Sequence, residues 1–494
     1  MNRHRIPAAA AAMALLVLAC ACAHVRPGED VRAGAAPSPA VPWTPPAQAS
    51  QAPETPPAPP IPENWTKGNT ILSLPEILDL ALRNNPSTRA AWFQARAAAA
   101  DLGSKRSEYF PEIDLGGNLT RQKSTTNFPP RTTYFLTTYG PTATLSLLLI
   151  DFGGRSGDVE EARQALYSAN WTHDAAIQNV VLLVEQAYYE YLNAKGLRDA
   201  AGASLNEAQT SYDSAQGRHD AGVSTIADVL QARTALSQAK LSLETVAGQI
   251  QTIRGALATA LGLPASAANL PVDLGDLPEN LDFGAADNAV DDLIAGAQRE
   301  RPDLAAARAD ALKAQAHIRT VRSEGLPALH ASGAANRTYY SSPTSGPFST
   351  NYSGALQISV PLFTGFRNTY DTLEAREQAK AAGARLESLR QQVILEVWTS
   401  YFDLKTAGQR VQTARDLLDS AKQSQEVALG RYKNGVGSIL DLLTAQSALA
   451  SARAQEVQAR SDWFLAVAQL AHDTGILGPP AGPPPSAPKK KETP

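Results

Sequence analysis

The sequence predicts a mainly helical chain that also contributes four transmembrane β-strands. Three observations support this fold class. The body of the chain is one unit that occurs twice. Each copy contains a long stretch without proline, such as residues 156–220, which is typical of an uninterrupted helix. Each copy also contains two segments in which apolar and polar residues alternate, which is the pattern of a strand with two different faces.

The first residues have the pattern of a bacterial signal peptide. Two arginines form a basic start, and residues 8–18 form an apolar segment that is too short for a comfortable transmembrane helix. The sequence "VLAC", which ends at Cys20, resembles a lipobox. We therefore expect a lipoprotein signal peptide over residues 1–19 and a covalent lipid on Cys20. Cys22 is a second candidate for lipidation, and cleavage without lipidation is the alternative.

Two further segments are expected to lie outside the folded body. Residues 20–70 are rich in proline and alanine, which predicts an extended, lipidated tether. Residues 477–494 are rich in proline and lysine, which predicts a disordered tail. The formal net charge is −4, so we expect no strong attraction to nucleic acid.

The repeat is clearest in one short stretch. "GRYKNGVGSILDLLTAQSALASAR" begins at Gly430 and "GRHDAGVSTIADVLQARTALSQAK" begins at Gly217; eleven of the 24 positions are identical at an offset of 213 (430 − 217). Similar offsets relate "RNNP" to "RERP", "SEYFP" to "SEGLP" and "DFGGR" to "FTGFR". These pairs predict a first repeat over residues 71–265, an equatorial linker over 266–289 and a second repeat over 290–476.

Each repeat is predicted to run in the order helix, two strands, long helix, turn, helix. The first helix covers about residues 73–106 and ends before a proline. The long helices cover about residues 156–220 and 368–433, and each is about 100 Å long at about 1.5 Å per residue. The return helix of the first repeat covers about residues 225–262. Because a first helix and a return helix together match one long helix, we expect a short helix of one half to stack end to end on a short helix of the other.

The strands are expected at about residues 112–123 and 132–150, and again at about 328–341 and 352–363. Each segment has about the 9–11 residues that a strand needs to cross a bilayer. Tyrosine and phenylalanine cluster near the segment ends, as in an interfacial aromatic belt. An amphipathic hairpin on a soluble core is the alternative interpretation.

Transmembrane strands in this chain imply an oligomer. Four strands cannot close a barrel, because single-chain barrels have about eight or more. An open sheet edge in lipid would leave backbone groups without hydrogen-bond partners. Two chains would supply about eight strands and three chains about twelve.

The body of the chain resembles the outer membrane factor (TolC-like) family, especially its lipoprotein members in multidrug efflux. The resemblance rests on the lipobox, the "NNP" and "ERP" helix starts, "SExxP" before each hairpin and "FGGR" or "FTGFR" after it. It also rests on the "G-V-x-x-I-x-D-x-L-x-A" turns at Gly222 and Gly435. The matching motifs cover about residues 70–475, and their order and duplication are more specific than any one of them.

This resemblance implies a homotrimer with a 12-stranded barrel in the outer membrane. The long antiparallel helices would form a periplasmic α-barrel, onto which a periplasmic adaptor protein and an inner-membrane pump would dock. The family has no catalytic activity of its own, so no cofactor is implied apart from the lipid on Cys20. The implied function is a lipid-anchored exit duct in the outer membrane that passively conducts drugs or other small molecules.

The resemblance also directs attention to the two turns. In such proteins the helices beside the turns close the tunnel, and rings of aspartate or hydrophobic residues narrow it. By position, Asp441 and Leu440 are the best candidates for the constriction, and Asp228 is the equivalent residue of the first repeat. The turns themselves are marked by Gly222, Gly435, Arg218 and Arg431.

A second interpretation of both aspartates stays open. An acidic residue near a helix start is usually a partner of the helix dipole or is simply solvated. The sequence also departs from relatives that have a second acid one turn further on, because Thr444 stands there. Gly437 and Ser447 occupy positions where an arginine could lock a closed state. Arg218 and Arg431 are candidates to pair with carboxylates instead.

Other functions have less support. The seven histidines lack metal-ligand spacing, and the sequence contains no phosphate-binding loop, nucleophile elbow or HExxH motif. We therefore expect neither a metal site nor an enzyme. One alternative function is the outer-membrane channel of a type I protein-secretion system. Another, from a different class, is a periplasmic coiled-coil scaffold without a channel.

Overall fold

The computed structural model describes residues 72–126, 132–265, 274–279, 281, 289–341 and 347–478. All of these residues belong to one compact unit, Pro60–Pro494. The predicted signal peptide, Cys20, Cys22 and the tether lie outside the described residues, as do most of the predicted linker and almost all of the predicted tail.

The two repeats contain the same elements in the same order. The first repeat contains α4 (Leu74–Asn84), α5 (Pro86–Ser107), β1 (Glu112–Thr126), β2 (Thr132–Ile150), α6 (Gly154–Asp220) and α7 (Ile226–Ala260). The second contains α8 (Val290–Glu300), α9 (Pro302–Ser323), β3 (Ala328–Tyr340), β4 (Phe348–Ser359), α10 (Arg367–Lys433) and α11 (Ile439–Asp473). The expected order is confirmed, with one additional helix at the start of each repeat.

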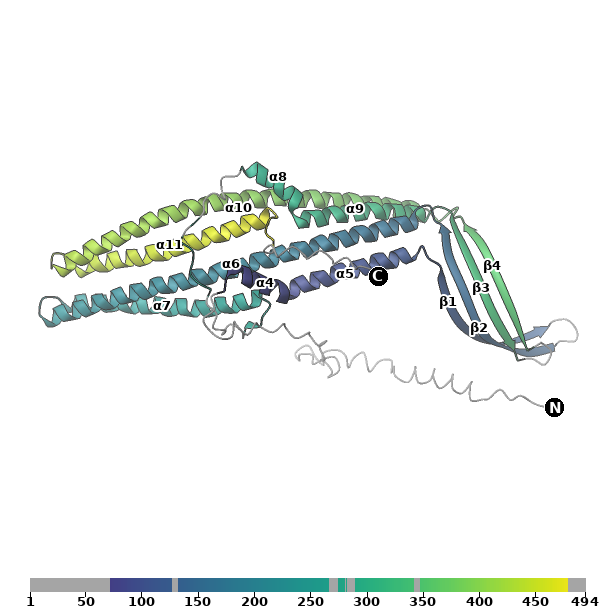
Figure 1. The fold of residues 1–494 in the computed structure, drawn as a ribbon, viewed down its shortest axis with the longest axis horizontal. Helices are drawn as coiled ribbons and strands as arrows, with labels where there is room; N and C mark the ends of the chain where they lie inside the picture. Colours follow the sequence, from purple (N-terminus) through teal and green to yellow (C-terminus); the bar gives the residue numbers. More distant parts are fainter. Residues whose placement is uncertain are drawn as a thin grey trace, which may run out of the picture. The chain divides into compact units, whose positions relative to one another are not determined.

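The long helices and their neighbours lie side by side (Figure 1). Helices α5 and α7 pack along α6, α6 also packs against α9 and α11, and these two pack along α10. The strands follow the same sequence: β1 comes after α5, β2 before α6, β3 after α9 and β4 before α10. Because the antiparallel sheet has the order β1-β2-β3-β4, the order of the strands repeats the order of the helices.

The first helix of each repeat is broken, which corrects the single helix expected over residues 73–106. Pro86 and Pro302 begin α5 and α9, and the preceding residues, Asn85 and Arg301, are extended, with ψ angles of 125° and 124°. Proline disfavours helical backbone at the preceding residue and has no N–H with which to continue a helix. The apolar pattern continues on both sides of the break, so periodicity alone suggested one helix.

The short helices stack end to end within each repeat, which corrects the expected stacking between repeats. The side-chain amide of Asn85, at the start of α5, donates to the carbonyl of Ala260, the last residue of α7, at 3.2 Å. Arg301 Nη1, at the start of α9, donates to the carbonyl of Asp473, the last residue of α11, at 3.3 Å. Each return helix runs back along its own long helix, so it meets the short helix of its own repeat. We call these two meeting points the joints.

The joint of the second repeat is charged. The Arg301 guanidinium donates to both oxygens of Asp303, at 3.0 and 2.6 Å, and to Glu396 of α10 at 2.6 Å. Burial opposes ionisation of Asp303, but the hydrogen bonds and the charge of Arg301 outweigh it, so the pKa of this carboxyl lies below its usual value. The corresponding residue of the first repeat, Asn85, is neutral and equally buried.

Both joints pack against the same part of α6. Leu261 follows α7, Leu477 follows α11, and both belong to one apolar cluster with the valines of residues 180–184. Gln178 of α6 also donates to the carbonyl of Gly475 at 2.8 Å. The cluster therefore connects the two repeats at the level where each row of short helices is interrupted.

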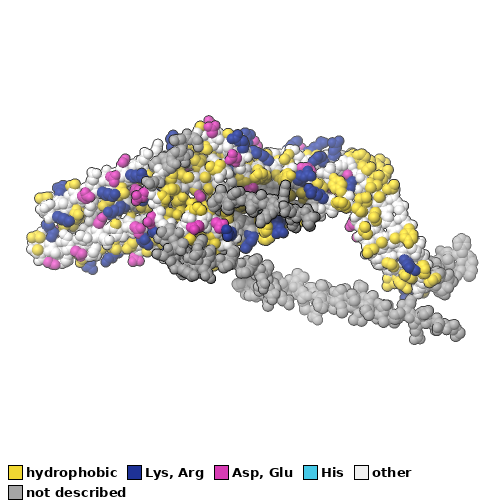
Figure 2. Space-filling view, viewed as in Figure 1, with side chains coloured by type: hydrophobic (Ala, Val, Ile, Leu, Met, Phe, Trp, Pro, Cys, Tyr) yellow, Lys and Arg dark blue, Asp and Glu magenta, His cyan; other side chains and the backbone are white. Residues whose placement is uncertain are grey.

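The two faces of the sheet differ in polarity. Directly paired residues of antiparallel strands share a face, and the register brings the apolar side chains of all four strands together. We call this side the apolar face; its large members include Ile113, Leu115, Leu119, Phe135, Tyr139, Leu145, Leu147, Leu329, Tyr339, Phe348, Tyr352, Leu356 and Ile358. The opposite face carries mainly Thr, Ser, Asn and Gln. Figure 2 shows hydrophobic side chains gathered over the sheet.

The strand ends differ from the expected ones in two places. Strand β1 continues to Thr126, and β4 covers Phe348–Ser359 instead of residues 352–363. Strand β4 ends two residues before Pro361, which has no N–H for a sheet hydrogen bond. Within the described part of the chain, no helix is both long enough and apolar enough to cross a membrane.

Candidate functional site

The two turns that reverse the long helices have the same backbone. Gly222 and Gly435 have φ angles of 74° and 75°, in the left-handed region that glycine enters without a steric penalty. Val223 N donates to Arg218 O at 2.9 Å, and Val436 N donates to Arg431 O at 3.0 Å. These bonds span five residues and satisfy carbonyls at each helix end, as in a Schellman motif. The predicted role of both glycines in the turns is consistent with this geometry.

Both predicted aspartates cap the returning helix. Asp228 accepts from Thr225 N at 3.1 Å while its own N–H donates to Thr225 Oγ1 at 3.3 Å. Asp441 and Ser438 form the same reciprocal pair, at 3.3 and 3.1 Å. Each pair is a capping box, which satisfies two N–H groups at the helix start. One oxygen of each carboxylate is used in this way, and the Asp441 side chain is exposed.

The turns differ in how they pack. In the second turn Ile439 is 4% exposed and lies in a cluster with Leu442 and Tyr432. In the first turn the corresponding Ile226 is 56% exposed. Leu440, the predicted hydrophobic partner in the constriction, is 60% exposed, so the apolar surface of both turns is only partly covered within one chain.

One side chain joins the two turns. Arg218 Nη1 donates to the carbonyl of Tyr432 at 3.3 Å, and its guanidinium lies 5.1 Å from the centre of the Tyr432 ring. Burial raises the pKa of the Tyr432 hydroxyl, Arg218 lowers it and Asp228 raises it, so the net direction is upward. The carboxylate partner suggested for Arg218 is therefore replaced by a backbone carbonyl and an aromatic ring. Arg431, the equivalent residue, is exposed beside its own turn.

Further contacts between the repeats continue along α6 and α11. Arg453 pairs with Glu207 at 2.7 Å, and Gln446 donates to Ser211 at 2.9 Å. Farther from the turns, Tyr189 stacks on Phe464 with ring centroids 4.9 Å apart. Burial, with smaller contributions from Glu185 and Tyr188, raises the pKa of the Tyr189 hydroxyl to about 12, so this group stays protonated at neutral pH.

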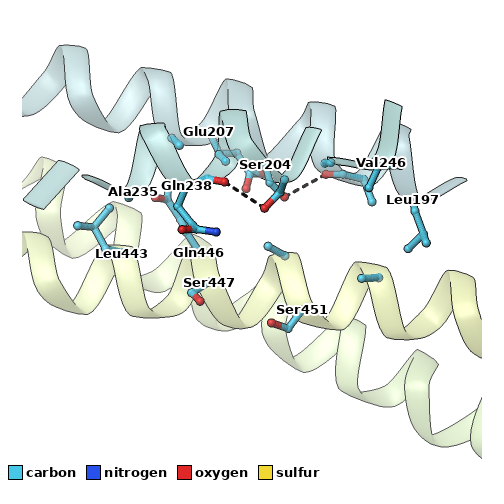
Figure 3. Close-up of a pocket in the computed structure, with 17 residues that line it drawn as sticks. Leu197, Ser204, Glu207, Ala235, Gln238, Val246, Leu443, Gln446, Ser447 and Ser451 are labelled. Atoms are coloured by element: carbon cyan, nitrogen blue, oxygen red, sulfur yellow. Dashed lines mark hydrogen bonds between the residues drawn. The ribbon is translucent and has the colours of Figure 1, made fainter. Parts of the chain in front are cut away.

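A groove of 440 Å³ lies between the first repeat and α11 (Figure 3). Ser204 and Gln238 line it from the first repeat, and Gln446, Ser447 and Ser451 line it from α11. The remaining lining is mainly alanine, and its one carboxylate, Glu207, is paired with Arg453. The described lining therefore offers space and hydrogen-bonding groups rather than a nucleophile beside a base. Among the described residues, no cluster of His, Cys, Asp or Glu is arranged to hold a metal ion.

The sequence predicts the two turns but not the contact between them. The repeat alignment located both glycines and both aspartates. Tyr432 is not among the residues that the motifs mark. It stands opposite His219 at the same offset of 213 (432 − 219), so it is one of the places where the repeats differ. Such a difference inside an otherwise matched turn was the available signal.

Comparison with known proteins gives one consistent result. A sequence model of the family described as outer membrane efflux protein matches residues 77–263 and 293–475, which correspond to the two repeats. Protein CyaE of Bordetella pertussis is 29% identical over 389 residues, which cover 78% of this chain and 80% of that protein. The probable efflux pump outer membrane protein TtgC of Pseudomonas putida is 25% identical over 387 residues, covering 77% of this chain and 78% of the relative.

The fold is also found in a solved structure. The Campylobacter jejuni CmeC outer membrane channel superimposes with a TM-score of 0.73 at 18% identity, covering 83% of this chain and 87% of that chain. The similarity extends over the helices and the four-stranded antiparallel sheet, which confirms the predicted fold class.

Proposed function

The chain belongs to the outer membrane efflux protein family, and from this premise we propose that it is the exit duct of a tripartite efflux system. The family consists of outer-membrane channels and not of enzymes. In this proposal an inner-membrane pump supplies the energy, and a periplasmic adaptor connects the pump to the duct. Drugs or other small molecules pass through passively. The resemblance to a probable efflux pump outer membrane protein supports this role.

The observation that carries the proposal is the placement of the sheet. The residues of all four strands alternate between an apolar face and a polar face, and two of these strands, β2 and β4, lead into helices of 67 residues. Such a sheet suits lipid on one side and water on the other. Helices of this length, about 100 Å at about 1.5 Å per residue, suit a tunnel that crosses the periplasm.

We further propose a homotrimer. Among the described strands, β1 and β4 each have one neighbour, so each offers an edge for pairing with another copy. Three copies supply about twelve strands and close the barrel. Chemical cross-linking in outer-membrane fractions should give a trimer. A predominant dimer would contradict this stoichiometry and favour a barrel of about eight strands.

The proposed anchor is a lipid on Cys20. The residue lies outside the described part of the chain, and the lipobox ending at this position supports the proposal. Labelling cells with radioactive palmitate should mark the wild-type protein and the Cys22→Ser variant but not Cys20→Ser. Label that is lost only in Cys22→Ser would assign the lipid to Cys22.

For the constriction, we propose that Asp441 and Leu440 narrow the opening at the turns, with Asp228 beside them. Threefold symmetry brings three copies of each exposed side chain together. In this arrangement the carboxylates attract cations and repel one another. The contact of Arg218 with Tyr432 holds the two turns of one chain together and thereby favours the closed opening.

The capping role of Asp441 must be separated from this proposed role. Asp441→Asn keeps an acceptor for Ser438 N–H but removes the charge, whereas Ser438→Ala removes the cap hydroxyl and keeps the charge. In planar bilayers we expect Asp441→Asn to change single-channel conductance and cation selectivity several-fold, and Ser438→Ala to change neither. If Ser438→Ala changes the conductance and Asp441→Asn does not, Asp441 only caps the helix.

The efflux function itself is tested in cells. Deleting the gene should raise accumulation of a fluorescent drug substrate, and restoring the gene should reverse this effect. Adaptor and pump genes beside it would support the proposal. An ABC transporter gene with a secreted toxin, together with unchanged drug accumulation after deletion, would favour the type I secretion channel.

A further inference from the structure

The basic residues of the sheet are unusually placed. The four strands contain three Lys or Arg residues, Arg121, Lys123 and Arg337, and the register puts all three on the apolar face. Arg121 pairs with Thr137 and Lys123 with Phe135, next to the pair formed by Leu119 and Tyr139. Positive charge on a face that suits lipid is costly at mid-membrane depth and is expected only near an interface.

All three basic residues lie toward the end of the sheet that is farthest from the helices. Arg121 is nine residues beyond Glu112 (121 − 112), and Arg337 is nine residues beyond Ala328 (337 − 328). At about 3.3 Å per residue this is about 30 Å along the strand. Tilted by about 40°, such a strand rises about 23 Å, which is close to the roughly 25 Å apolar band of outer-membrane barrels. The three charged side chains therefore lie at the outer edge of the apolar band, where the membrane meets the cell exterior.

Aromatic rings surround these charges. The Arg337 guanidinium lies 4.1 Å from the centre of the Phe348 ring, and the Arg121 guanidinium lies 5.6 Å from that of Phe135. Phe348 pairs with Tyr339, and Phe135 with Lys123, so each ring is two residues nearer the far end than its arginine. Both arginines thus lean toward the interface, as snorkelling side chains do. Tyr139 and Tyr339 stack beside them, with centroids 5.3 Å apart.

No acidic residue balances this cluster. Residues 115–150 and 331–362 contain no Asp or Glu, whereas they contain the three basic residues and also Arg131. The acids of the strands, Glu112 and Asp114, lie at the opposite end and on the polar face. The outer end of the lipid-facing surface is therefore purely cationic in each chain.

We propose that this cationic, aromatic patch binds the phosphate groups of an outer-leaflet lipid, namely phosphorylated lipid A. We name it the outer collar; it consists of Arg121, Lys123, Arg337, Phe135, Tyr139, Tyr339 and Phe348. Arginine and lysine are the residues that pair with phosphate, and aromatic side chains settle at headgroup level. Lipid A presents sugar-linked phosphates at this depth in the outer leaflet. The inference rests on the proposed barrel, because it needs the apolar face to contact lipid.

The test uses the full-length protein purified from outer membranes in mild detergent. The collar variant is Arg121→Ala, Lys123→Ala and Arg337→Ala together. The matched control, Arg376→Ala, Lys380→Ala and Arg390→Ala, removes the same charge from exposed positions on α10. Native mass spectrometry then counts the lipid A molecules that remain bound. Delipidated protein is also titrated with lipid A in the presence of excess phosphatidylglycerol or inorganic phosphate.

We expect wild type and control to retain lipid A, and the collar variant to bind it about a hundredfold more weakly, since each of the three basic residues near a charged lipid surface contributes about fivefold to affinity. Restoring the charge with lysine at positions 121 and 337 should recover most of the binding. Equal lipid A retention in collar variant and control would overturn the proposal. Competition by phosphatidylglycerol or inorganic phosphate as effective as by lipid A would also overturn it, because the patch would then bind phosphate without preference for this lipid.

A separate measurement identifies a failure of the barrel itself. Wild-type protein should resist carbonate extraction from membranes and migrate as a trimer. If it does not, the barrel proposal and the collar proposal both fail. If the membrane trimer is intact in every variant and lipid A retention is unchanged, the collar alone fails.

Discussion

The two joints occupy equivalent places in the two repeats but are built from different chemistry. In the first repeat Asn85 bridges to the end of α7 with a neutral amide. In the second, Arg301 bridges to the end of α11 and is held by Asp303 and Glu396. The backbone break is the same because both are followed by proline. The comparison shows that local sequence sets where the helix breaks, whereas the surrounding side chains decide how strongly the ends are held.

The largest difference is expected from removing the bridging side chains. Arg301→Met leaves Asp303 and Glu396 without their partner and should lower the free energy of unfolding by about 3 kcal/mol, a value near the low end for buried pairs because both carboxylates are partly exposed. Asn85→Ala loses one hydrogen bond and one helix cap and should cost about 1 to 2 kcal/mol. Denaturant titration followed by far-UV circular dichroism measures both. Equal losses would show that the charge adds nothing to the joint.

Acid should remove the advantage of the charged joint. The pKa of Asp303 is lower in the folded protein than its unfolded value of about 3.9. Its ion pair therefore stabilises the fold fully above that pH, and this stabilisation is lost as the pH falls through the folded pKa. The difference between wild type and Arg301→Met should shrink below about pH 4. A difference that stays constant from neutral pH to pH 3 would contradict this origin.

The turns should show a smaller contrast in packing. Ile439→Ala removes a side chain that is 4% exposed and should cost about 2 to 3 kcal/mol. Ile226→Ala removes one that is 56% exposed and should cost under about 1 kcal/mol. The same denaturant titration compares them. An equally large loss for Ile226→Ala would indicate that a neighbouring copy covers the first turn.

The turn glycines should show no contrast at all. Gly222→Ala and Gly435→Ala each force a side chain into left-handed backbone, and each should cost about 1 kcal/mol. Neither added methyl group meets a close neighbour, because the nearest atom found is Arg218 Nη2, at 3.9 Å from the position at Gly435. The midpoint temperature of thermal unfolding should therefore fall by similar amounts in both variants. A much larger effect in one variant would mean that the turns are not equivalent in backbone strain.

The element order, the four strands and both turns were predictable because each depends on local pattern. Alternation gave the two faces of the sheet, and the repeated glycine and aspartate positions marked the turns. The packing differences were not predictable in this way. The burial of Ile439, and its contrast with Ile226, depend on Tyr432 and on contacts between distant helices. The sequence alone also leaves the role of Asp441 open. An aspartate that caps the helix and an aspartate that narrows the opening would both stand at this position near the helix start.

The stacking of short helices was predicted with the wrong partner for a related reason. A first helix and a return helix together are as long as one long helix. Length alone, however, does not indicate whether the two helices that meet belong to the same repeat or to different repeats. The carbonyl of Ala260 is within hydrogen-bond reach of Asn85 only because α7 folds back along α6. A contact of this kind is decided by the path of the chain in space.

The joints also have a mechanical consequence. An unbroken helix resists bending through its ladder of backbone hydrogen bonds, whereas two helices that meet end to end are held only by side chains and a few carbonyls. Both joints lie beside the same segment of α6, so the compliant points of the chain fall at one level. Bending at that level would let the turns swing while the strands keep their position. A mutation in a joint can therefore alter the stiffness of the chain far from any residue that a transported molecule touches.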